Sequence, residues 1–291
     1  MQDATPVTLG QEFSGYAKQI EFNIARVNKS LEDVHFLAQG GTAVGTGINC
    51  KPGFPKKFAE EVSKFTGYNF KTAPNKFEAL ACNDALVEFS GTLNTIAVSM
   101  MKIANDVRWL ASGPRCGIGE IEIPANEPGS SIMPAKVNPV IPEVVNQICF
   151  QIMGDDLTIS LAAAAAQLQL NAFEPIVLFN LFEAMTLLRR GCVTLKEKGV
   201  DGITANAEHC KEEVMRSAGL LTAFTPYIGY ETAAKIAKKV QHSEQTVYEL
   251  VKESGLLSDE DIETILSPEN MTRPHVDMKI VKRVHEKIAE K

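Results

Sequence analysis

A ten-residue segment at positions 129–138 combines residue types that could bind an anion and activate a base. It contains one Gly, two adjacent Ser, one Pro, one Lys and one Asn. Glycine permits backbone geometry that is closed to other residues, and small hydroxyl residues leave amide N–H groups free to face an anion. Lys136 adds a positive charge, and Asn138 can both donate and accept hydrogen bonds. The same composition also suits an ordinary polar turn between two helices.

The segment resembles the signature loop of the fumarase/aspartase superfamily, lyases that eliminate a group from succinyl-type substrates to give fumarate or a fumaryl compound. Residues 2–12, 40–47 and 112–115 resemble other segments of the same family. In the family a Thr-His pair stands just before the segment that begins here at Gln2, and an amino-terminal domain supplies further substrate-binding residues. The resemblance therefore implies the carboxyl-terminal part of a lyase, without the amino-terminal domain and with little activity by itself.

Elimination from a succinate skeleton removes a weakly acidic proton beside a carboxylate. It requires a base, and positive charge and N–H dipoles that stabilise a carboxylate-stabilised carbanion. A serine is a feeble base unless its alkoxide is stabilised, and the loop amides can supply such a nest. By the resemblance, Ser130 is the catalytic base that takes the proton beta to the leaving group. The predicted substrate-binding residues are Lys136, Asn138, Met133 and Ser131.

Glu143 lies one helical turn beyond the loop, where the family has a carboxylate that orients its catalytic His. That His has no counterpart here, because none of the five histidines follows a Thr. A solvated carboxylate in the first turn of a helix is therefore an interpretation of nearly equal weight. Arg108 and Arg115 flank a Ser-Gly-Pro break, where they could bind anions or form salt bridges at the ends of helices.

The choice of substrate depends on two groups of segments that resemble different family members. Residues 72–80 and 103–109 resemble fumarase, whereas residues 140–147, 167–171 and 202–206 resemble aspartate ammonia-lyase. We therefore predict elimination of ammonia from L-aspartate, with fumarate hydratase, acting on L-malate and fumarate, as the alternative. A non-catalytic oligomerisation fragment derived from such a lyase is the interpretation from a different class. Neither a metal nor a cofactor is predicted.

Apolar residues recur at helical spacing through most of the chain, which predicts an all-α fold. The long segments are expected to form helices at 8–36, 55–66, 77–111, 140–166 and 174–198. Because long apolar helices need partners, they predict a bundle, within a central domain of residues 1–206 that carries the loop. Shorter and more charged helices predict a small helical carboxyl-terminal domain at 207–291, with Ser243 and Ser258 as amino-terminal caps.

The composition limits which partners the protein is expected to bind and where in the cell it is expected to lie. The formal net charge is −7, and Lys and Arg are scattered among Asp and Glu, which gives no basic footprint for nucleic acid. The longest apolar stretches fall short of the ~20 residues that cross a bilayer, and no secretory signal opens the sequence. The six widely spaced cysteines predict reduced, mostly buried thiols in a cytoplasmic protein, with a mitochondrial matrix location after leader removal left open. The resemblance implies a homotetramer that binds a small dicarboxylate.

Overall fold

The computed structural model describes residues 2–290 and confirms the all-α prediction. The chain divides into two compact units. One contains the residues from Tyr16 to Thr204, and the other contains the described residues up to Gly15 together with those from Ala205 onward. The division into domains at residues 206 and 207 remains a prediction about independently folding parts. Each unit is described by itself.

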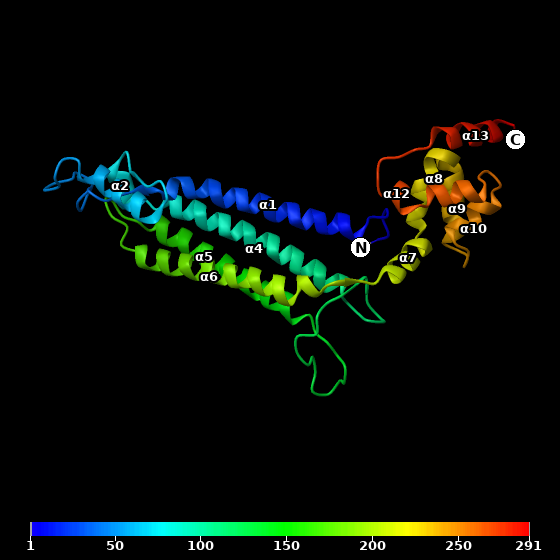
Figure 1. The fold of residues 1–291 in the computed structure, drawn as a ribbon, viewed down its shortest axis with the longest axis horizontal. Coiled ribbons are helices and arrows are strands. Elements are labelled where there is room, and N and C mark those ends of the chain that lie inside the picture. The colour runs from blue at the N-terminus through cyan, green and yellow to red at the C-terminus, as the bar shows by residue number, and fades with distance from the viewer. Residues whose placement is uncertain (1, 291) are drawn as a thin grey trace. The chain divides into compact units, whose positions relative to one another are not determined.

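Four long helices dominate the first unit, to which the first of them belongs from Tyr16 onward (Figure 1). They are α1 (Leu9–Val34), α4 (Asp84–Leu110), α5 (Val140–Ala164) and α6 (Glu174–Lys198). The helices α4 and α6 both pack against α5, and apolar residues of α1 pack against the same core. Its most deeply buried side chains include Ala97, Ala104, Ile159 and Val177. The buried alanines allow close approach of the helix backbones, as expected for a bundle.

A break interrupts the helix that periodicity predicts over 77–111. The chain instead forms α3 (Lys76–Ala81) and α4, because Cys82 has extended backbone angles. A distant contact accompanies the break, since Asn171 Nδ2 donates a 2.5 Å hydrogen bond to Asn83 Oδ1. The periodicity of apolar residues does not indicate this contact. The apolar spacing continues through the break, and the two bonded residues lie 88 positions apart in the sequence.

The segment between α1 and α3 contains one helix and one pair of short strands. The helix α2 (Phe54–Thr66) ends at Gly67, whose φ of 79° gives the left-handed C-cap expected of glycine. The strands β1 (Phe36–Leu37) and β2 (Lys71–Thr72) pair in parallel, with Phe36 opposite Lys71. The predicted helix 8–36 therefore ends two residues early, where its last residue enters a strand.

Between α4 and α5 the chain leaves the bundle as a long loop, drawn in green in Figure 1. It contains the strand β3 (Ile121–Glu122) and the predicted signature loop. After α6, a short 3-10 helix η1 (Val200–Gly202) and the strand β4 (Thr204–Ala205) lead to the boundary of the unit.

The second unit has its own apolar core, in which Phe224, Val251, Ile262 and Val284 are fully buried. Its elements are α7 (Ala207–Arg216), η2 (Ala218–Leu220), α8 (Leu221–Ile228), α9 (Tyr230–Val240), α10 (Val247–Glu253), α11 (Asp259–Ile265), α12 (Pro268–Met271) and α13 (Met278–Ala289). Ser258 caps α11 in a capping box with Asp261, as predicted. The prediction for Ser243 is wrong, because α10 begins later and Thr246 caps it through Glu249.

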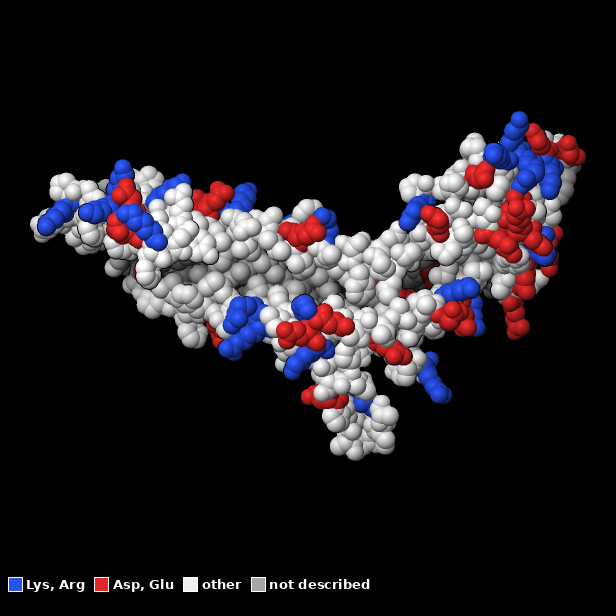
Figure 2. All heavy atoms as spheres, viewed as in Figure 1, with Lys and Arg blue, Asp and Glu red and all other residues white. Residues whose placement is uncertain are grey.

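None of the helices within residues 2–290 combines the length and the apolar character needed to cross a bilayer. On the face shown in Figure 2, Lys and Arg lie interspersed with Asp and Glu. No continuous basic stripe is visible there, in agreement with the scattered charges of the sequence.

Candidate functional site

The signature loop is closed at its base by hydrogen bonds between its two ends. The Gly129 N–H donates to the Lys136 carbonyl at 3.0 Å, and Asn138 Nδ2 donates to the Gly129 carbonyl at 2.9 Å. Within the loop, the Lys136 N–H donates to the Met133 carbonyl at 3.3 Å. The segment is therefore an internally bonded loop, not an open turn.

Two small residues meet the tightest backbone requirements of this loop. A Cβ at position 129 would lie 2.2 Å from the Lys136 carbonyl oxygen. Only glycine therefore allows the two ends of the loop to approach each other this closely. Ala135 adopts a φ of 64°, in the left-handed region that costs a residue with a Cβ about 1 kcal/mol. Glycine is required at position 129 by this close approach of backbone to backbone and not by special dihedral angles, because Gly129 is not among the glycines with positive φ.

Ser130 lies half-buried at the centre of a small cluster of backbone donors. Its Oγ accepts hydrogen bonds from the N–H groups of Ile132 at 3.2 Å and Met133 at 3.1 Å. Donors directed at an oxygen stabilise that oxygen when it carries negative charge. The loop therefore has the means to favour the alkoxide form of Ser130, which is what a serine base requires.

The remaining predicted loop residues differ in how far they are engaged. Ser131, Met133 and Lys136 are exposed, and the Lys136 ammonium forms no ion pair with any residue between 2 and 290. An exposed, uncompensated ammonium can bind a carboxylate. Asn138 is half-buried, and its Nδ2 closes the loop base, so only part of its hydrogen-bonding capacity is left for a substrate.

Glu143 lies in the first turn of α5, as predicted, and its carboxylate is directed to α4. Its Oε1 lies 3.7 Å from Arg108 Nη2, and both side chains are about 40% exposed, at 39% and 40%. The sequence left two roles open for Arg108, anion binding or a salt bridge. Within the described residues, Arg108 forms the salt bridge.

Two asparagines beside this pair were missed by sequence reasoning. Asn146 Nδ2 donates a 2.8 Å hydrogen bond to Asn105 Oδ1, and Arg108 Nη1 lies 3.4 Å from the same oxygen. Their sequence signal is a polar residue on an otherwise apolar helical face, three positions from Arg108 or Glu143. The structure thus places Glu143 in a separate polar cluster, while Ser130, Met133, Lys136 and Asn138 share the loop.

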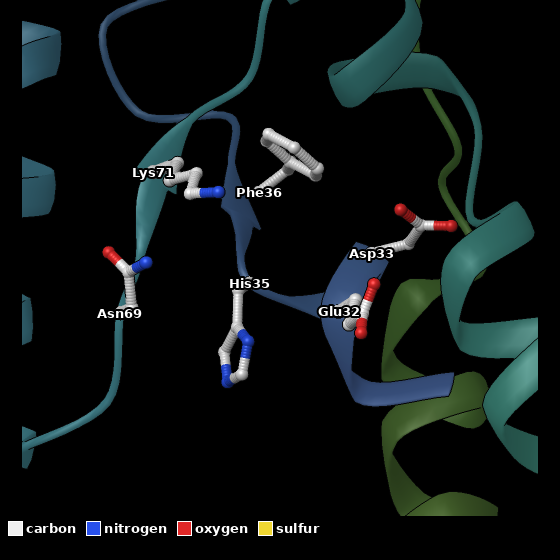
Figure 3. A pocket seen from close by; sticks show the side chains of 6 residues that line it. All are labelled: Glu32, Asp33, His35, Phe36, Asn69 and Lys71. Atoms are coloured by element: carbon white, nitrogen blue, oxygen red, sulfur yellow. The ribbon is translucent and has the colours of Figure 1, made fainter. Parts of the chain in front are cut away.

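A pocket of about 440 Å³ lies between the end of α1 and the strand β2, away from the loop residues (Figure 3). Its wall includes His35, whose ring stacks on Tyr68 and meets Phe70 edge-on at 5.0 Å between ring centroids. The other lining residues are Glu32, Asp33, Phe36, Asn69 and Lys71. None of the predicted site residues contributes to it. Among residues 2–290, no group of three or more His, Cys, Asp or Glu is arranged to hold a metal ion.

The six cysteines are free, but the prediction that they are mostly buried is wrong. Only Cys149 is buried, whereas Cys82, Cys116 and Cys192 are exposed. Cys82 follows the end of α3, Cys116 lies in the loop after α4, and Cys192 lies on α6. Spacing along the sequence does not indicate which of these positions is exposed. Burial raises the pKa of the Cys149 thiol to about 11, which makes it a poor nucleophile at neutral pH.

Two family models match the chain. One described as "Lyase" matches residues 1–154, and one described as "Fumarase C C-terminus" matches residues 220–273. The first match therefore spans more than half of the 291 residues and includes the whole signature loop.

Relatives of high sequence identity carry the name fumarate hydratase. The class II fumarate hydratase of Rickettsia bellii is 54% identical over 273 residues, which cover 94% of this chain and 59% of the relative. The mitochondrial fumarate hydratase of Saccharomyces cerevisiae is 50% identical over 274 residues, covering 94% and 56%. The chain thus spans less than two thirds of the length of the curated relatives that it matches.

Solved structures share the fold. A class II fumarase from Schistosoma mansoni superposes with a TM-score of 0.87 at 40% identity, covering 95% of this chain and 61% of that one. A protein from Brucella melitensis, described as fumarate lyase:delta crystallin bound to cobalt, gives a TM-score of 0.89 at 46% identity, covering 94% and 59%. The helical bundle is therefore that of fumarase-type lyases.

Proposed function

Because the chain belongs to the fumarase/aspartase superfamily of lyases, we propose that it supplies the signature-loop part of a fumarate hydratase, which interconverts L-malate and fumarate. One observation carries this proposal, the 54% identity to a class II fumarate hydratase over 94% of the chain. A match of that extent includes the loop and the long helices on both sides of it.

The preference for aspartate ammonia-lyase is not supported, and the alternative replaces it. The segments that resemble aspartase lie inside the stretch matched by proteins named fumarate hydratase. One of them contains Asn171, which is 2% exposed and bonds to Asn83 and to the Ala162 carbonyl. A buried residue with these partners joins helices, so likeness at Asn171 does not distinguish an amine leaving group from a hydroxyl.

In the proposed reaction, Ser130 acts as the base. Its alkoxide takes the proton from the carbon of L-malate next to one carboxylate, and the released electron pair moves into that carboxylate. That electron pair then returns to form the carbon–carbon double bond as hydroxide leaves from the neighbouring carbon, and an acid contributed from outside the described residues protonates the hydroxide, so that fumarate and water are released. The N–H groups of Ile132 and Met133 support this role, because they donate to the Ser130 oxygen.

The other loop residues bind the dicarboxylate in this proposal. Lys136 provides the positive charge for a carboxylate, and its exposure without an ion pair among the described residues supports that role. Asn138 Nδ2 uses one N–H to hold the loop closed, which leaves its second N–H to donate to a carboxylate. Ser131 and Met133, both exposed, lie at the loop surface beside the substrate. Glu143 orients a base or acid contributed from outside the described residues.

The activity test adds an amino-terminal part that this chain does not span. The chain is joined to the amino-terminal part of the Rickettsia bellii fumarate hydratase, its 54% identical relative, and given L-malate or L-aspartate. Fumarate absorbance and ammonia release are followed together. We expect fumarate from L-malate, no ammonia from L-aspartate, and little or no turnover by the 291-residue chain alone.

Each outcome decides between the candidate functions. Ammonia and fumarate from L-aspartate, with none from L-malate, would restore the aspartase assignment. A folded fusion that turns over neither substrate would favour the non-catalytic oligomerisation fragment. The control is the same fusion built from the relative's own two parts, which must be active for either negative result to count.

A further inference from the structure

Four polar side chains form a cluster where the end of α4, which precedes the signature loop in sequence, packs against the start of α5, which follows the loop. Asn105 and Arg108 come from the last turns of α4, and Glu143 and Asn146 come from the first turns of α5. Asn105 Oδ1 accepts from Asn146 Nδ2 at 2.8 Å and lies 3.4 Å from Arg108 Nη1. The second guanidinium nitrogen, Nη2, lies 3.7 Å from Glu143 Oε1. The planar fork of Arg108 therefore connects an amide on its own helix with a carboxylate on the next one.

This cluster is costly for the stability of the fold. Arg108 Nε and Asn146 Oδ1 are both buried, and neither has a hydrogen-bond partner among residues 2–290. Buried polar atoms are normally paired, and each one left unpaired costs about 1–3 kcal/mol. Apolar residues would hold two helices together at less cost. A cluster that is expensive for stability and adjacent to a reactive loop is expected to serve the geometry of that loop.

A continuous set of contacts leads from Arg108 to the base of the loop. Glu143 is held by Arg108, and its N–H donates to the Pro139 carbonyl at 3.1 Å. Pro139 follows Asn138, whose Nδ2 is bonded to the Gly129 carbonyl next to Ser130. A shift of Glu143 relative to α4 therefore changes where the loop base lies.

We infer that Arg108, together with Asn105 and Asn146, is a positioning residue that fixes Glu143 and the loop bearing Ser130 relative to the bundle. This inference rests on the proposed hydratase function. Arg108 does not touch the substrate in this arrangement. It acts by keeping Glu143 and the loop base at a fixed position relative to α4. The loss of Arg108 therefore affects the rate of the chemical step more than the binding of malate.

The test compares charge-matched variants on one helix. In the active fusion, Arg108→Gln removes the fork and its charge, and Arg108→Lys keeps the charge without the fork. The control is Lys102→Gln on α4, whose ammonium pairs with Asp106 and not with α5. For Arg108→Gln we expect kcat to fall by roughly tenfold to hundredfold with KM little changed, because small misplacements of reacting groups cost that much. Arg108→Lys should give an intermediate rate, and Lys102→Gln should stay near the parent.

A double-variant cycle examines whether Arg108 acts through Glu143. Once Glu143→Gln has been made, adding Arg108→Gln should lower kcat little further, because residues that act as one unit are non-additive. Full additivity would overturn the inference. A rise in KM with unchanged kcat for Arg108→Gln would overturn it as well, because Arg108 would then bind the substrate carboxylate directly.

A second measurement does not depend on turnover. Amide hydrogen exchange is followed in the 291-residue chain at Gly129 and Glu143, whose N–H groups hold the loop base and the start of α5. Arg108→Gln should speed exchange at both amides, and Lys102→Gln should not. If the parent fusion lacks hydratase activity, the proposed function fails while this measurement still decides the positioning role. Unchanged exchange at both amides in Arg108→Gln would refute it.

Discussion

At the scale of single residues, the signature loop supplies its own environment for Ser130. The donors to its Oγ are amides two and three positions later, so the arrangement is local to the loop. Gly129 makes this possible, because a Cβ there would collide with the Lys136 carbonyl at the loop base. Both features follow from the order of residues within the loop. The prediction of a functional loop over an ordinary polar turn also needed the family resemblance, because the composition suits both.

The variant Ser130→Ala tests the proposed base in the active fusion. Alanine removes the oxygen but leaves the loop nearly the same size, so turnover should fall by roughly a hundredfold or more while KM changes little. The comparison is Ser131→Ala, an exposed neighbour in the same loop. Because Ser131 is proposed to bind substrate, its variant should mainly raise KM. Near-parental turnover in Ser130→Ala would move the base assignment to Ser131 or to a residue outside the loop.

At the scale of helices, the sequence predicted correctly those features that depend on residues close together in the sequence. Periodic apolar residues placed α5 and α6 within two residues of their observed ends. The break before α4 was missed, since it coincides with a hydrogen bond from Asn171 to Asn83, 88 positions away. The same holds for the site, where the contact of Arg108 with Glu143 joins two helices.

Two adjacent aspartates in the middle of α5 provide a test at this scale. Asp155 is 1% exposed, its Oδ1 accepts from Gln151 Nε2 at 2.8 Å, and its Oδ2 has no hydrogen-bond partner within residues 2–290. Burial, and then the charge of Glu183, raise the pKa of Asp155, while the bond from Gln151 lowers it. The folded chain therefore holds this proton more tightly than the unfolded chain. Asp155 opposes folding increasingly as the pH rises from about 4, the ordinary value for Asp, through its raised folded pKa.

The variant Asp155→Asn should therefore stabilise the chain at pH 7 by about 1 kcal/mol and have little effect near pH 4. The measurement is the melting temperature across that pH range. Asp156→Asn is the matched control, because Asp156 accepts 2.6 and 2.8 Å bonds from Ser90 and Asn94. An amide there replaces two hydrogen bonds to a charged acceptor by weaker neutral ones, so this neighbour should destabilise the chain at neutral pH. An equal effect of Asp155→Asn at both pH values would contradict the assignment.

At the scale of the molecule, the bundle is unfinished as a single chain. Large apolar side chains of α5 and α6 remain more than half exposed, namely Phe150, Leu157, Leu161, Phe179 and Phe182. Monomeric proteins rarely leave such a series open, and Figure 2 shows large uncharged areas over the bundle. Exposed apolar side chains in series on α5 and α6 suit contact with the same faces of other copies. These observations support the proposed homotetramer.

The assembly prediction can be tested on the chain as it is. Light scattering should report a mass about four times that of one chain, because burying the open helix faces removes apolar area from water. Phe182→Glu places a charge within that area, so it should shift the mass toward smaller species at the same protein concentration. The control is Met278→Glu, which adds the same charge at a 69% exposed apolar residue of α13. It should leave the mass unchanged, because a lone exposed side chain outside the bundle needs no partner. A monomeric parent chain, or an equal loss of mass in both variants, would show that these faces of α5 and α6 are not what joins the copies.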